Sequence, residues 1–139
     1  MYRVKNGDTI SDIYSFTSGN NDGSYEFAFV GDPQIGAGST DSDIEGWNET
    51  LKTISSKFNA DFLLSGGDQV NTASNETQYT GYINELFTSL PSATTIGNHD
   101  SGSAAYNQHL TCQTKALTKD RQLPEATTGL FTKIHFSLI

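Results

Sequence analysis

The sequence predicts an α/β domain with a largely parallel sheet, because strand-like apolar runs alternate with segments of helical periodicity. Three short apolar runs each end in a glycine followed by a polar residue, at Gly31-Asp32, Gly67-Asp68 and Gly97-Asn98. Two longer segments between these runs carry apolar residues at helical spacing. This β-α-β-α-β order is typical of parallel sheets with right-handed crossovers.

The segment before the domain predicts a β-hairpin. Tyr2 and Val4 precede the turn dipeptide Asn6-Gly7, and residues 13–17 follow with aromatic and polar side chains in alternation. Because two strands alone are not stable in water, we expect the hairpin to pair with a later segment or to end a domain that begins upstream. The Gly-, Asn- and Ser-rich residues 18–24 predict a linker.

The first α/β unit begins with a strand over residues 25–30. A Gly- and Ser-rich loop follows, and then a helix with Asp41 or Ser42 as its N-cap. Its apolar positions fall at helical spacing and are Ile44, Trp47, Leu51, Ile54 and Phe58. The sequence therefore predicts one amphipathic helix between the first two strands.

The second unit repeats this pattern. It begins with a strand over residues 62–64 and continues with a helix over 76–90, which ends before Pro91 because a residue preceding proline avoids the helical conformation. The inward face of this helix is predicted to consist of Tyr79, Tyr82, Ile83, Leu86 and Phe87. A third strand is expected over residues 93–96.

Composition excludes several classes of function. The 139 residues carry a formal net charge of −8, so the chain should repel nucleic acid and anionic membranes. The single cysteine, Cys112, excludes an internal disulfide and a Cys-rich zinc module. No apolar run reaches the length of a membrane span, and the first residues do not form a signal peptide.

The polar residues at the strand ends predict a metal site. In parallel α/β sheets, ligands bind at the carboxyl ends of the strands, so Asp32, Asp68, Asn98 and His99 should share one rim. Oxygen and imidazole ligands without thiolate suit Mn, Fe, Zn or Mg. A carboxylate shared by two ions about 3.5–4 Å apart would form a dinuclear centre that orients a phosphate ester and activates a water nucleophile.

Simpler interpretations remain open for each residue alone. A Gly-Asp pair is most often an ordinary turn, and Asn98-His99 alone is compatible with a loop that contains a hydrogen-bonded histidine. We interpret His109 as a helix-surface residue and His135 as incidental. The combination carries more weight, because each polar pair follows an apolar strand.

Three segments resemble the first motifs of calcineurin-like metallophosphoesterases, in order and with typical spacing: Gly31-Asp32-Pro33-Gln34-Ile35-Gly36, Gly66-Gly67-Asp68-Gln69-Val70-Asn71 and Gly97-Asn98-His99-Asp100. The resemblance covers roughly residues 26–110, and the third motif is the most specific. It implies the N-terminal half of a metallophosphoesterase α/β sandwich, a partial domain over residues 25–110. Residues 1–19 resemble the last strands of the fibronectin- or immunoglobulin-like domain that precedes purple-acid-phosphatase-like members.

The resemblance also implies roles for individual residues. Asp32 would bind the first metal, Asp68 would bridge both metals, and Asn98 would bind the second. His99 would contact the substrate phosphate or protonate the leaving group. The cofactors of the complete enzyme would be two divalent or trivalent ions, Fe, Mn or Zn, and the substrate a small phosphate ester.

This chain departs from the family pattern at two positions. Many members have histidine two residues after the first aspartate, where this chain has Gln34, whose carbonyl oxygen could replace the imidazole as a metal ligand. Purple acid phosphatases have a metal-binding tyrosine three residues after the bridging aspartate, where this chain has Asn71. A tyrosinate-Fe(III) chromophore is therefore not expected.

The family completes its site with a later histidine and a Gly-His-x-His loop, and neither occurs here. The tail after Leu110 also changes in composition, with 4 of the 8 basic residues but only 2 of the 16 acidic ones. We therefore expect residues 111–139 to be an out-of-frame or disordered tail. Back-translation permits codons that, with one T restored after His109, encode a Gly-Gly-Asp turn and an alternating aromatic strand.

Three functions remain open at the level of sequence. The first is metal-dependent hydrolysis of phosphate esters by a dinuclear centre. The second is an inactive fragment of such an enzyme, and the third is a non-catalytic α/β module that binds a cation at its acidic rim. Sequence indicates neither the substrate nor the oligomeric state nor the localisation, although the relatives that it resembles are often exported.

Overall fold

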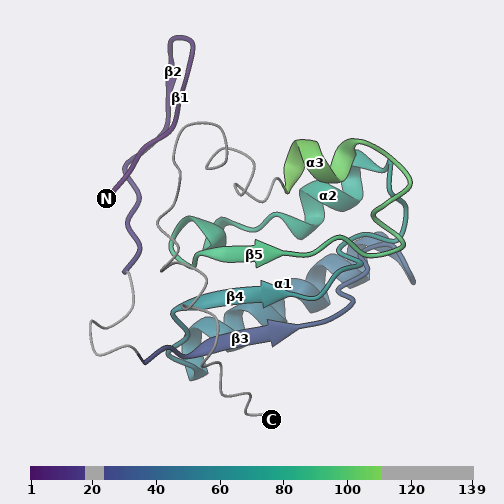
Figure 1. The fold of residues 1–139 in the computed structure, drawn as a ribbon, viewed down its shortest axis with the longest axis horizontal. Coiled ribbons are helices and arrows are strands. Elements are labelled where there is room, and N and C mark those ends of the chain that lie inside the picture. Colours follow the sequence, from purple (N-terminus) through teal and green to yellow (C-terminus); the bar gives the residue numbers. More distant parts are fainter. Residues whose placement is uncertain (18–23, 111–139) are drawn as a thin grey trace, which may run out of the picture.

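A computed structural model describes residues 1–17 and 24–110. Its centre is a three-stranded parallel sheet in the order β3-β4-β5, formed by β3 (Phe27–Val30), β4 (Phe62–Ser65) and β5 (Ser92–Thr94) (Figure 1). Phe27 pairs with Phe62, and Leu63 pairs with Ser92. The predicted parallel α/β order is confirmed. The predicted linker at 18–24, apart from Ser24, and the predicted tail at 111–139 lie outside the described residues.

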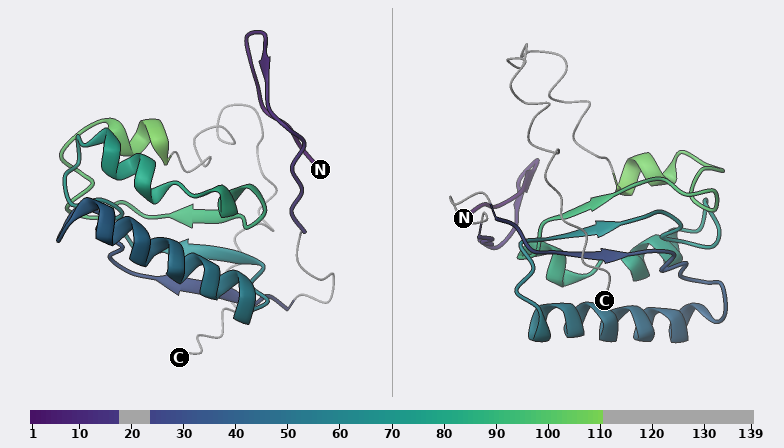
Figure 2. Two further views of the ribbon diagram at one scale, coloured as in Figure 1. Left: turned by 180° about the vertical axis from the view of Figure 1, so that it is seen from behind. Right: turned by 60° about the horizontal axis from the view of Figure 1, so that its bottom comes forward.

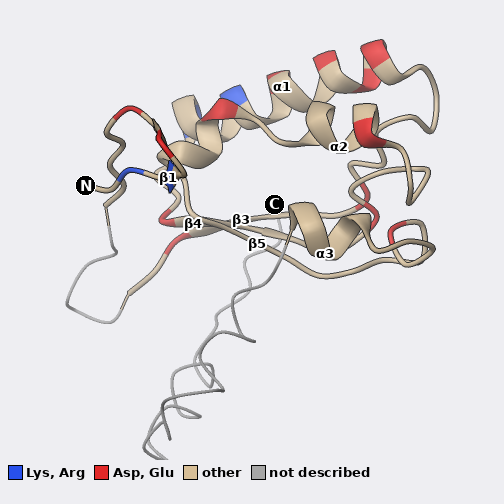
Figure 3. Cartoon of the chain, turned by 90° about the horizontal axis from the view of Figure 1, so that it is seen from above, with Lys and Arg blue, Asp and Glu red and all other residues tan. Residues whose placement is uncertain are grey.

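Helices α1 (Thr40–Lys57) and α2 (Glu76–Tyr82) lie on the same face of the sheet (Figures 2 and 3). A short 3-10 helix, η1 (Glu85–Thr88), follows α2, and α3 (Ala105–His109) lies beyond β5. Figure 3 shows acidic residues at the end of the sheet where α1 and α2 begin. No helix in the described part of the chain combines the length and apolar character that a bilayer crossing requires.

The predicted N-cap of the first helix was wrong. Asp41 and Ser42 lie inside the first turn of α1, and Ser39 is the N-cap, with its side chain accepting the N–H of Ser42 at 3.5 Å. Asp41 and Asp43 nevertheless favour this end, because they lie in the first turn, next to the positive end of the helix dipole. Phe58 is the C-cap and is largely exposed.

The prediction of one continuous helix over 76–90 was also wrong. The carbonyl of Tyr82 would accept the N–H of Leu86 in a longer helix, but it accepts the Trp47 Nε1–H at 2.8 Å instead. The N–H of Leu86 turns to the Asn84 side chain at 2.8 Å, which caps η1. Ile83, between the two helices, is extended and 44% exposed rather than inward.

The strand boundaries moved by one or two residues. β3 begins at Phe27 rather than at Tyr25, which is exposed. β5 ends at Thr94 rather than at Ile96, whose side chain is also exposed. Thr95 still donates its N–H to the Ser65 carbonyl at 3.0 Å, so the chain stays beside β4 up to the last loop.

The predicted hairpin exists, with its strands close to the turn. β1 (Lys5–Asn6) pairs antiparallel with β2 (Thr9–Ile10), so the two-residue turn is Gly7-Asp8 rather than Asn6-Gly7. Of the predicted strand over 13–17, only Tyr14 pairs, through an isolated bridge to Tyr2. Tyr2 also donates its hydroxyl to the Thr88 carbonyl at 2.9 Å, which ties the hairpin to η1.

The main core lies between α1 and the sheet. Its buried residues are Ile35, Trp47, Leu51, Ile54, Leu63, Tyr82 and Leu90. A second cluster packs α2 against α3 and consists of Val70, Tyr79, Ala105 and Tyr106. Two tyrosines therefore connect α2 with both clusters.

We expect the free energy of unfolding to fall as the pH rises above about 10. Burial is the main cause that raises the pKa of Tyr79 to about 12. Between pH about 10 and about 12, the folded chain thus keeps a phenolic proton that the unfolded chain releases. Each rise in pH within this window therefore lowers the free energy of unfolding. Thermal unfolding at pH 9 to 12 measures this, with Tyr79→Phe less alkali-sensitive and exposed Tyr25→Phe unchanged. Equal alkali sensitivity of wild type and Tyr79→Phe would contradict the expectation.

Candidate metal centre at the carboxyl end of the sheet

The three polar loops that the sequence predicted to form a site follow β3, β4 and β5, and all three lie at the carboxyl end of the sheet. Asp32 and Asn98 are exposed, and His99 is half-buried. Asp68, between them on the central loop, is only 8% exposed. This loop is therefore the one to which the others attach.

Backbone strain concentrates at the predicted metal ligands. In the described part of the chain, three non-glycine residues have φ in the left-handed region: Asp32 at 45°, Gln34 at 41° and Asp68 at 49°. Each such residue costs about 1–2 kcal/mol relative to the right-handed conformation. Strained residues persist only where surrounding contacts hold them, and they cluster at functional sites.

The loop after β3 (the first loop) and the loop after β4 (the second loop) continue side by side beyond the strands. Gln34 donates its N–H to the Asp68 carbonyl at 2.8 Å, and Ile35 donates to the Gln69 carbonyl at 3.1 Å. Asn71 returns a hydrogen bond to the Ile35 carbonyl at 3.0 Å, and Ile35 and Val70 form a parallel bridge. This pairing attaches the backbone of the Asp32–Gln34 turn to that of Asp68.

The second loop and the loop after β5 (the third loop) approach each other most closely at two glycines. A Cβ on Gly67 would lie 3.1 Å from the Gly97 Cα, and a Cβ on Gly97 would overlap the Asp68 Oδ1 and backbone N. This close approach lets the His99 N–H donate to Asp68 Oδ1 at 2.8 Å. The structure thus brings Asp68 next to the Asn98-His99 segment.

The hydrogen bonds of His99 assign its tautomer. His99 Nδ1 lies 2.9 Å from the Asn71 carbonyl oxygen. Because a carbonyl only accepts, Nδ1 carries the proton, and Nε2 is left as the atom that can contact a ligand. A neutral His99 presents a lone pair there, and a protonated His99 presents an N–H.

The two positions that depart from the family pattern contact each other. Gln34 Nε2 donates to Asn71 Oδ1 at 3.2 Å. With its amide nitrogen used in this way, Gln34 has its Oε1 available for a cation. Asn71 holds His99 through its main chain and Gln34 through its side chain.

Sequence reasoning assigned no role to three residues that support the loops. Asp43 Oδ2 accepts the N–H groups of Gly36 and Gly38 at 2.9 and 3.0 Å, which folds the first loop onto the start of α1. Gln78, from α2, accepts the Thr72 N–H at 2.8 Å. The third is Asp100, the last residue of the third motif. Asp43 and Gln78 carried no signal in the sequence beyond their polar side chains, whereas Asp100 was part of the third motif. All three prove to be half or fully buried.

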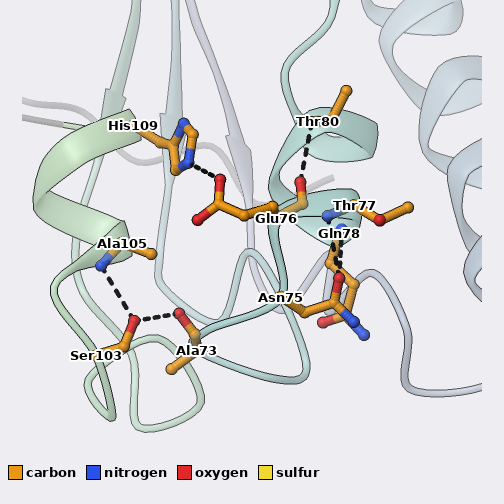
Figure 4. Close-up of polar contacts among 9 residues, drawn as sticks. All are labelled: Ala73, Asn75, Glu76, Thr77, Gln78, Thr80, Ser103, Ala105 and His109. Carbon is orange, nitrogen blue, oxygen red and sulfur yellow. Dashed lines mark hydrogen bonds and ion pairs between the residues drawn. The ribbon is translucent and has the colours of Figure 1, made fainter.

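The second loop is attached to the starts of α2 and α3 through its residues Ala73 and Asn75. Figure 4 shows Asn75 capping α2 by accepting the N–H groups of Thr77 and Gln78, at 3.0 and 3.2 Å. Ser103 donates to the Ala73 carbonyl and accepts the Ala105 N–H. These contacts fix the loop between two helices.

His109 lies on a helix as predicted, but it is not a free surface residue. Its Nε2 is 2.6 Å from Glu76 Oε2 (Figure 4). Its ring stacks on Tyr79 with centroids 5.0 Å apart. The histidine is half-buried and connects α3 to α2.

The donors at the site fit a hard cation. Asp32, Gln34, Asp68 and Asn98 all offer oxygen, which Mg²⁺, Mn²⁺ and related ions prefer. Asp68 Oδ1 accepts the His99 N–H, while the described residues donate no hydrogen bond to Oδ2. Over residues 1–17 and 24–110, however, no group of three or more His, Cys, Asp or Glu side chains is arranged to hold a metal ion. A metal here would thus depend on the amide oxygens.

A family model described as calcineurin-like phosphoesterase matches residues 25–135. No curated protein and no solved structure matches the chain.

Proposed function

The chain belongs to the calcineurin-like phosphoesterase family, and from this premise we propose that it hydrolyses phosphate esters with metal ions bound at the carboxyl end of its sheet. The observation that carries the proposal is the convergence on Asp68. The turn that contains Gln34 donates to its carbonyl at 2.8 Å, and His99 donates to its side chain at 2.8 Å.

The family resemblance supplies the residues that we propose as metal ligands. Asp32 and Gln34 Oε1 would bind the first ion, Asp68 would bridge, and Asn98 would bind the second. When bound, the ions would supply the positive charge that polarises the phosphoryl group and activates a water nucleophile.

His99 has its own part in the reaction. Because Nδ1–H is held by the Asn71 carbonyl, Nε2 is the atom that would meet the substrate. In the protonated state, Nε2–H can donate to a phosphate oxygen, or its proton can pass to the departing alkoxide, which leaves a neutral imidazole. Loss of the Nδ1 contact would free the ring to rotate and misplace this proton.

The purple-acid-phosphatase-like subtype is part of the same proposal. The aromatic hairpin attached to η1 through Tyr2 supports it, since such members carry a β domain before the catalytic one. With Asn71 in place of a tyrosine, a tyrosinate-Fe(III) chromophore is not expected.

Replacing Asp68 by Asn is expected to lower p-nitrophenyl phosphate hydrolysis in Mn²⁺ by at least about 100-fold, because the shared carboxylate is lost. Asp8→Asn, which makes the same charge change at the exposed hairpin turn, should keep full turnover. Circular dichroism is the control that tests whether both variants fold. Hydrolysis that continues at the wild-type rate in Asp68→Asn, or in the presence of a metal chelator, would refute the proposal.

A second candidate is a cation-binding module without turnover. It is favoured by the lack, in the described residues, of three clustered His, Cys, Asp or Glu side chains, because a second ion would have only Asp68 and Asn98. Calorimetric titration of Mn²⁺ separates the two candidates. Binding heat without any hydrolysis supports the module, whereas hydrolysis that depends on Asp68 supports the enzyme.

A further inference from the structure

Asp100 is a fully buried carboxylate that follows the predicted site residues Asn98 and His99. Its side chain is 0% exposed. Burial of an ionised carboxylate is costly unless hydrogen bonds compensate for the lost water. In the described part of the chain, no basic side chain forms an ion pair with it. Its compensation comes from backbone N–H groups.

Those N–H groups belong to two different loops. Oδ1 accepts from Gln69 at 3.0 Å and from Val70 at 3.3 Å, and Oδ2 accepts from Gly97 at 2.9 Å. Gln69 is also within 3.4 Å of Oδ2. One side chain therefore joins the loop after β4 to the loop after β5.

The two N–H groups of the second loop belong to Gln69 and Val70, which directly follow Asp68 in the sequence. Asp68 has φ 49°, and the two N–H groups after it donate to one carboxylate oxygen, as in the concave backbone clusters that bind anions. The Asp100 carboxylate fills that cluster. It thereby stabilises the strained conformation that aims the Asp68 side chain at the third loop.

We propose that Asp100 is a positioning residue that holds Asp68 in its left-handed conformation and in register with His99. The inference rests on the proposed function for its consequence in catalysis. The effect of Asp100 on the conformation of Asp68 can be measured without any assay of hydrolysis. A positioning role differs from a purely structural one in one respect. Loss of the Asp100 carboxylate should weaken a hydrogen bond in which Asp100 itself takes no part.

That bond is the one from the His99 N–H to Asp68 Oδ1, at 2.8 Å. In Asp100→Asn, one acceptor oxygen is replaced by an NH2 group that faces backbone donors, so the cluster after Asp68 should open. Amide hydrogen exchange by NMR is expected to accelerate at Gln69, Val70 and Gly97, and also at His99, by about tenfold or more.

The control for general destabilisation is Leu51→Ala, in the core below α1, where the side chain is 1% exposed. Under conditions that match the two variants in stability, Leu51→Ala should leave the relative protection of His99 unchanged. Mn²⁺ affinity is the second readout, with an expected loss of about tenfold or more in Asp100→Asn alone.

Two results would overturn the inference: wild-type protection of the His99 amide in Asp100→Asn, or equal losses at His99 in both variants. Failure of the proposed function is distinguishable from either. If the wild type does not hydrolyse p-nitrophenyl phosphate, but Asp100→Asn still releases the His99 amide, the positioning role holds and only the activity is refuted.

Discussion

Replacing Gly97 by alanine is expected to abolish Mn²⁺ binding and phosphate-ester hydrolysis and to lower the free energy of unfolding by about 3 kcal/mol or more. The added Cβ would occupy the space of the Asp68 carboxylate and of its backbone nitrogen. One of these neighbours is backbone, and a Cβ on the opposing Gly67 would itself lie only 3.1 Å from the Gly97 Cα. The third loop must then move away from the second.

Gly46→Ala is the matched control, because a Cβ at this position on α1 meets nothing within 4 Å. It should raise stability by about 0.5–1 kcal/mol, since glycine weakens a helix interior. Urea unfolding and Mn²⁺ titration compare the two variants. A Gly97→Ala protein with wild-type stability and wild-type affinity would show that the loops are not in contact as described.

Replacing Trp47 by alanine is expected to destabilise the fold by about 3–5 kcal/mol. The indole is 5% exposed, stacks on Tyr82 with centroids 5.2 Å apart, and donates to the Tyr82 carbonyl at 2.8 Å. Its removal leaves a cavity between α1 and α2 and an unpaired carbonyl at the end of α2.

Trp47→Phe helps to separate these two contributions, because it keeps most of the apolar contact but removes the indole N–H. We expect it to cost a smaller amount, about 1–3 kcal/mol, including the unsatisfied carbonyl. Since Trp47 is the only tryptophan, unfolding has to be followed by circular dichroism. A loss below about 1 kcal/mol in Trp47→Ala would mean that the α1–α2 contact does not stabilise the domain.

Much of the fold and the location of the candidate site could be predicted from local patterns. Apolar runs with glycine at their ends identified the three strands, and helical spacing identified α1. Parallel strand order then placed Asp32, Asp68 and the Asn98-His99 pair at one end of the sheet, where the structure has them. What remained unpredicted depended on contacts between residues far apart in the chain.

The break between α2 and η1 is one example. Residues 76–90 have a continuous helical pattern, and only the indole of Trp47, 35 positions from Tyr82, takes the carbonyl that the helix would need. The capping role of Ser39 is another example. Asp41 and Ser42 are equally good caps by residue type, but the loop geometry that Asp43 imposes on Gly36 and Gly38 starts the helix earlier.

The sequence by itself determined the strand–helix order, the family, and the polar residues that end each strand, because these depend on residue type and spacing. Only the tertiary structure decided how those residues are aimed. The left-handed turn at Asp68, the Nδ1–H tautomer of His99 and the bridge made by Asp100 between two loops each require a partner about 30 residues away. Such contacts form when the strands pair, and no local pattern encodes them.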